Sequence, residues 1–108
     1  MNIMRRVAQF ILDLNKIQTE AVIRLNSRLN VYKMLYTACG LPEEVAARLE
    51  QKIIDALYRS VDEQHALTSQ WINGESDLLE FLDRYKDWFR EHMDHCSRIT
   101  AEELSSAA

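Results

Sequence analysis

The feature that most constrains the fold is the stretch Ile3–Ala38, which contains no Gly and no Pro. Such a stretch can continue as one α-helix of about ten turns, roughly 54 Å long at 1.5 Å per residue. At 100° per residue, its apolar side chains gather on one broad face. The members of this main face are Ile3, Val7, Phe10, Ile11, Leu14, Ile17, Ala21, Val22, Leu25, Leu29, Tyr32, Leu35 and Tyr36. We expect a long helix whose main face is covered by the rest of the chain.

The first break in the helical pattern is the sequence Cys39-Gly40-Leu41-Pro42. Glycine is the residue that most often ends a helix, because it adopts the left-handed conformation without strain. Proline suits the first position of the following helix. The sequence therefore predicts a second helix over about 42–72, antiparallel to the first.

The second break is Asn73-Gly74-Glu75-Ser76, in which Gly74 ends a helix and Ser76 is suited to cap the next one. A third helix is predicted over about 77–98. Residues 99–108 are expected to form a short tail with at most one helical turn. An aromatic cluster is expected near this break, formed by Phe10, Trp71 and Leu78 with Phe81 or Trp88.

Strand signals are absent, and two Gly and one Pro in 108 residues indicate few, long helices. The fold class is therefore predicted as all-α. We expect one domain over residues 1–98, an up-down-up three-helix bundle with a long first helix. Because the first helix is longer than the third, part of its main face should lack cover within the chain, which favours dimerisation.

Arg28 lies inside the apolar arc of the first helix, and Glu50 inside that of the second. Antiparallel pairing around the first break places the two residues at the same level. A buried charge is costly unless it is paired. The sequence therefore predicts a buried Arg28–Glu50 ion pair that fixes the register of the two helices.

Leu12, Ile23 and Met34 form a separate apolar line on the polar side of the first helix. They lie eleven residues apart, close to three helical turns, so they share one thin strip. Single exposed apolar residues need no explanation, but a strip can bind a partner. We interpret these three residues as protein-binding, toward a second copy of the chain and another protein.

The net charge of −4 and the scattered positions of the 13 basic residues speak against nucleic acid as a partner. No stretch has the length and apolarity of a transmembrane helix. The cytoplasm is the default location. Cys39 and Cys96 are expected to lie too far apart for a disulfide.

Two chemical alternatives concern the third helix. His92 and Cys96 share one face, and His65 lies on the second helix, but a zinc site needs about four converging ligands. Arg90 and His95 have the spacing Arg-x4-His, which resembles the ribonuclease motif of HEPN helical toxins. That resemblance implies a nuclease helical bundle in which these two residues act.

Two further resemblances come from composition. A small acidic helical chain is similar to secretion or flagellar export chaperones, and Gln18-Thr19-Glu20-Ala21 resembles the helical phasins that coat polyester granules. The residues favour a non-enzymatic interaction module, namely an adaptor, chaperone or regulatory subunit, acting as a homodimer with no metal or cofactor. Metal binding, HEPN-like nuclease activity and a phasin-like or chaperone-like role remain the alternatives.

Overall fold

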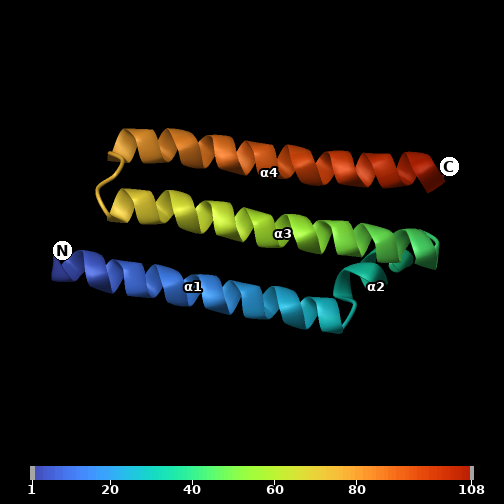
Figure 1. Ribbon diagram of the computed structural model, residues 1–108. Helices are drawn as coiled ribbons and strands as arrows, with labels where there is room; N and C mark the ends of the chain where they lie inside the picture. The colour runs from blue at the N-terminus through green and yellow to red at the C-terminus, as the bar shows by residue number, and fades with distance from the viewer. Residues whose placement is uncertain (1, 108) are drawn as a thin grey trace.

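The computed structural model describes residues 2–107, which form helices and short connections and no strand (Figure 1). The elements are α1 (Ile3–Arg28), α2 (Val31–Ala38), α3 (Glu43–Ile72) and α4 (Leu78–Ala107). The predicted all-α class is confirmed. Gly40 and Gly74 both have positive φ angles, 99° and 78°, so both predicted breaks use the left-handed conformation open to glycine.

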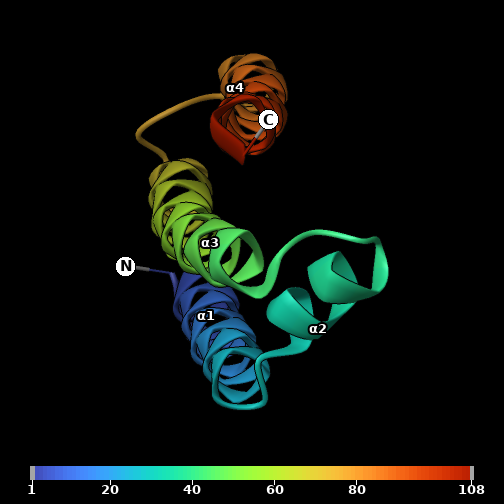
Figure 2. The same ribbon diagram turned by 90° about the vertical axis from the view of Figure 1, so that its right-hand side faces the viewer.

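The predicted single helix over residues 3–38 is wrong, because the structure interrupts it at Leu29 and Asn30. The Leu29 N–H donates to the Leu25 carbonyl at 3.0 Å and closes α1. Asn30 then adopts a left-handed conformation with φ of 52°, which asparagine tolerates better than most residues. The short helix α2 therefore leaves in a new direction and lies beside the long helices (Figure 2).

The expected tail at residues 99–108 is also wrong, because α4 continues to Ala107. No Gly or Pro interrupts it, and the Thr100 hydroxyl donates to the Cys96 carbonyl within the helix at 2.9 Å. Ile99 and Glu103 are buried. Because Ile99 packs with residues of α3, this last part of α4 belongs to the core of the fold.

The three long helices lie side by side in one layer with α3 in the middle (Figures 1 and 2). Both α1 and α4 pack on α3, and within the described residues they do not pack on each other. The overall extents are 54 × 26 × 15 Å. Since a helix with its side chains is about 10–12 Å across, the layer is little more than one helix thick. The helices alternate in direction as expected, but they form an open layer in place of the expected bundle.

The core lies between α3 and α4, near the start of α3. Its buried members are Leu49, Ile53, Ala56 and Ile99, with Tyr36, Leu41, Leu57 and Cys96 packed around them. The presence of Tyr36 shows that α2 closes this end of the core. The core is therefore completed by an element that the sequence placed in the first helix.

An aromatic row continues this interface toward the other end of α4. Trp71 stacks on Phe81 with ring centroids 4.8 Å apart, and Tyr85 and Trp88 follow at 5.7 and 5.0 Å. The Trp88 indole also donates to the Ser60 carbonyl at 3.1 Å. Of the predicted cluster, Trp71 and Phe81 are in contact, but Phe10 and Leu78 are exposed and lie outside the row.

Candidate interaction surface

The main apolar face is exposed all along α1, whereas the sequence predicted that only part of it would lack cover. Its residues step 4-3-4-3 along the helix, and no other helix of the described chain covers them. The exposed fractions are 71% for Ile3, 50% for Val7, 67% for Phe10, 42% for Leu14 and 61% for Ile17. Monomeric proteins rarely expose apolar patches this long, so this face is the strongest candidate for an interaction surface.

Polar contacts explain why α1 turns its other side toward α3. The His65 ring nitrogen Nε2 lies 2.7 Å from Oδ1 of Asp13, and Lys16 forms an ion pair with Asp62 at 3.1 Å. The Gln9 side chain donates to the Ser69 hydroxyl at 3.1 Å. The hydrogen bond from His65 holds the pKa of the Asp13 carboxyl below its usual range. The α1 members of these pairs lie outside the main apolar face that the sequence predicted.

The predicted line of Leu12, Ile23 and Met34 does not form one surface. Ile23 is buried at 5% exposure and Leu12 is half-buried, on the same side of α1 as the polar contacts to α3. Met34 lies beyond the break at Asn30 and is exposed on α2. The line depended on an uninterrupted helix, and the change of direction before α2 separates its last member from the first two.

The predicted Arg28–Glu50 ion pair is wrong. Arg28 is exposed and makes no salt bridge to Glu50 within residues 2–107. Glu50 is buried, and its Oε2 accepts the backbone N–H of Lys33 at 2.8 Å. This N–H is in the first turn of α2, whose own N-cap, Asn30, makes no side-chain hydrogen bond there. The carboxylate therefore caps α2 from a neighbouring helix.

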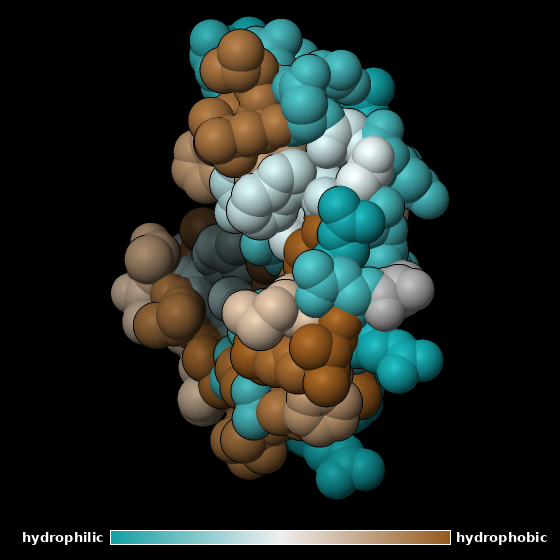
Figure 3. Space-filling model, turned by 90° about the vertical axis from the view of Figure 1, so that its left-hand side faces the viewer, coloured by the Kyte–Doolittle hydropathy of each residue, from teal (hydrophilic) through white to brown (hydrophobic). Residues whose placement is uncertain are grey.

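Polar and apolar surfaces are segregated on the molecule. Figure 3 shows apolar residues gathered at the lower part of the molecule, where α1 lies, and polar residues along the right-hand side. A second row of exposed apolar residues follows α4, made of Leu78, Leu82, Phe89, Met93 and Leu104. The layer therefore has apolar surface on two of its long helices.

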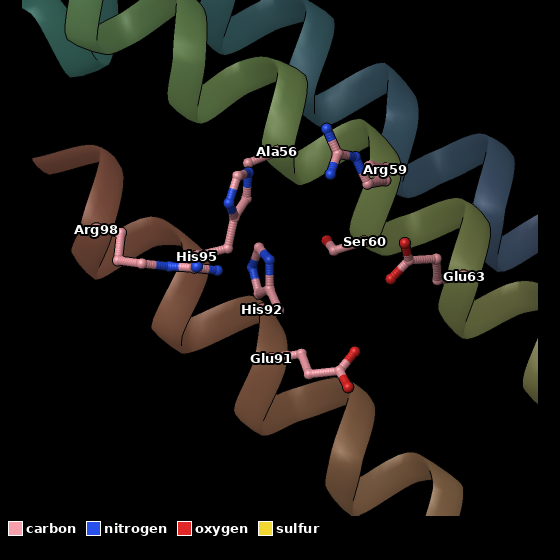
Figure 4. Close-up of a pocket in the computed structure, with 8 residues that line it drawn as sticks. All are labelled: Ala56, Arg59, Ser60, Glu63, Glu91, His92, His95 and Arg98. Atoms are coloured by element: carbon pink, nitrogen blue, oxygen red, sulfur yellow. The ribbon is translucent and has the colours of Figure 1, made fainter. Parts of the chain in front are cut away.

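A polar recess of about 230 Å³ lies between α3 and α4 (Figure 4). It is lined by Ala56, Arg59, Ser60, Glu63, Glu91, His92, His95 and Arg98. The ring of His92 stacks on Trp88 with centroids 6.2 Å apart, and both its nitrogens lie 3.9 Å from the Cys96 sulfur. Burial raises the pKa of the Cys96 thiol.

The recess does not assemble the chemistry of either alternative. No group of three or more His, Cys, Asp or Glu in residues 2–107 is placed to hold a metal ion. Of the Arg-x4-His pair, His95 lines the recess, whereas Arg90 is exposed and pairs with Asp87 at 3.9 Å. The two residues of the HEPN-like motif therefore face different surroundings.

Within the described residues, no helix has both the length and the apolarity that crossing a membrane requires. Comparisons of the chain with protein-family models, with curated proteins and with solved structures find no match.

Proposed function

We propose that this chain is a non-enzymatic protein–protein interaction module that acts as a homodimer. The observation that carries the proposal is the exposed main face of α1, with Phe10 and Ile17 more than half exposed. Removing such side chains from water is favourable by about 25 cal/mol per Å² of apolar surface. A second copy of the chain offers the same face and is always present at the same concentration.

The polar recess supports this choice over the enzymatic alternatives. The histidines and arginines of the recess are exposed or half-buried and come from two helices. Arg90, the partner of His95 in the Arg-x4-His motif, lies outside the recess. Its lining includes the carboxylates of Glu63 and Glu91 and the guanidinium groups of Arg59 and Arg98, so the two signs of charge are mixed in the recess. We place the module in the cytoplasm, where the free thiols Cys39 and Cys96 would stay reduced.

The test is the mass of the purified full chain by light scattering over a range of concentrations. The proposal predicts twice the monomer mass of 12.7 kDa at micromolar concentration. Phe10→Glu should shift the mass to the monomer, because it puts a charge in the middle of the contact. Leu79→Glu is the matched control, since Leu79 is 78% exposed on α4 and lies outside the α1 face.

Two outcomes would overturn the proposal. A monomer mass of the unmodified chain at high micromolar concentration would exclude the homodimer, and binding of that monomer to lipid vesicles would favour the granule-surface role. A dimer that survives Phe10→Glu and dissociates with Leu79→Glu would move the contact from α1 to α4.

A further inference from the structure

The exposed face of α1 has the repeat of a coiled-coil seam, here called the outer seam. Its apolar members are Ile3, Val7, Phe10, Leu14, Ile17 and Ala21, which step 4-3-4-3-4 and are all exposed. The same spacing continues to Arg24 and Arg28, which are also exposed. The outer seam is therefore apolar over its first part and carries two arginines at its C-terminal end, beside the exposed Leu25 of the main face.

This asymmetry decides between the two ways in which a second α1 can pack on the first. In a parallel, in-register pair each residue meets its own copy, so Arg24 meets Arg24 and Arg28 meets Arg28 in the seam. Like charges held together in a contact oppose association. Along α1, neither arginine has an ion pair with an acidic residue of its own chain within residues 2–107 that would offset this repulsion.

We infer that two copies pair through α1 in the antiparallel direction, with Phe10 opposite the partner's Leu14. This inference rests on the proposed function, since it specifies the contact of the homodimer. In this register Val7 lies opposite the partner's Ile17, and Ile3 lies opposite the partner's Ala21. The two-fold axis passes midway between Phe10 and Leu14. Each of the three residue pairs therefore occurs twice along the seam, once on either side of the axis.

The antiparallel register satisfies both parts of the seam. All six apolar positions find an apolar partner, and the large Phe10 side chain meets a leucine in place of a second phenylalanine. Arg24 and Arg28 extend beyond the first residue of the partner's α1 and keep their hydration. Because α1 forms an edge of each layer, the pair joins two three-helix layers edge to edge (Figure 1).

Disulfide cross-linking on the full chain tests the register. In a Cys39→Ser, Cys96→Ala background, one variant carries Val7→Cys, a second carries Ile17→Cys and a third carries both. Positions 7 and 17 of one helix lie about 15 Å apart, and so do two copies of position 7 in the antiparallel pair. A disulfide requires Cα atoms within about 7 Å. Only the double variant should therefore form a covalent dimer under mild oxidation.

The outcomes separate the register from the dimer itself. Covalent dimers of the single variants would overturn the antiparallel inference in favour of the parallel pair. A dimer by light scattering without any cross-link would overturn the register while leaving the proposed function in place. A monomer by light scattering in the unmodified chain would overturn both.

A second readout uses the two arginines. Arg24→Ala together with Arg28→Ala should change the dimer dissociation constant by less than about threefold in the antiparallel register, because neither side chain enters the contact. The parallel register predicts a dissociation constant at least ten times lower for the double variant, because the change removes like charges from the seam. Such tighter binding would contradict the inference.

Discussion

The Oε2 atom of Glu50 accepts the backbone N–H of Lys33 at 2.8 Å, so a buried carboxylate on α3 caps the first turn of α2. The carboxylate also lies at the positive end of the α2 dipole. The contact holds α2 against the end of the core where Tyr36 packs. It gives Glu50 a structural role different from the predicted pairing with Arg28.

Replacing Glu50 by Ala should lower the free energy of unfolding by about 0.5–2 kcal/mol, the range measured for lost N-caps. Glu50→Gln should cost less, because its side-chain carbonyl can still accept the Lys33 N–H. Denaturant unfolding measures both. Arg28→Ala is the control and should stay within about 0.5 kcal/mol, since Arg28 is exposed. Equal losses in the free energy of unfolding for Glu50→Ala and Arg28→Ala would support the predicted ion pair in place of the cap.

Trp88 should be the most costly residue to truncate in the aromatic row. It touches Tyr85, Phe89 and His92 and donates its indole N–H to the Ser60 carbonyl. Trp88→Ala should lower stability by about 3–5 kcal/mol. Trp88→Phe keeps the ring contact and should lose about 1 kcal/mol, the net worth of the hydrogen bond.

Thermal melting of these variants provides the measurement. Leu79→Ala serves as the comparison, because that side chain is largely exposed on the same helix and should change stability by less than about 0.5 kcal/mol. A melting temperature for Trp88→Ala close to that of Leu79→Ala would mean that the row does not hold α4 on α3.

Ile23 and Met34 should behave differently, although the sequence grouped them. Ile23→Ala should lower stability by about 2–5 kcal/mol, because it opens a cavity beside α3. Met34→Ala should change stability by less than about 0.5 kcal/mol, because Met34 is exposed. Chemical denaturation measures both changes. Equal losses of stability for Ile23→Ala and Met34→Ala would contradict the different burial of the two side chains.

Acid should weaken the attachment of the end of α4 through Glu103. Its carboxylate pairs with Lys52 and with Arg48, which hold its pKa below the usual value of 4.5. A lowered pKa means that the ionised form stabilises the fold. This contribution is complete above pH 4.5 and is lost as the pH falls through the lowered pKa.

The melting temperature measured against pH should therefore show a gap between the unmodified chain and Glu103→Gln that narrows on acidification below pH 4.5. Glu102→Gln is the matched control, because Glu102 is exposed and forms no salt bridge among residues 2–107. A gap for Glu103→Gln that stays constant with pH would show that its ionisation does not matter to stability.

The sequence by itself determined the helical class, the two breaks at Gly40 and Gly74, and which residues share the main face of α1. These follow from local rules, because glycine conformation and helical periodicity depend on neighbours in the chain. The outer seam was therefore readable in the sequence as a set of residues. The sequence also indicated that part of the main face would lack cover, but not that this face is exposed all along α1.

Only the tertiary structure decided which side of each helix is covered. Periodicity says which side chains lie together but not what they meet, and α1 meets α3 through pairs such as Asp13 with His65 that are 52 residues apart. The break at Asn30 depends on the placement of α2, which is capped by Glu50 from another helix. Contacts between distant segments set both outcomes, so the local pattern placed the cover on the wrong side of α1.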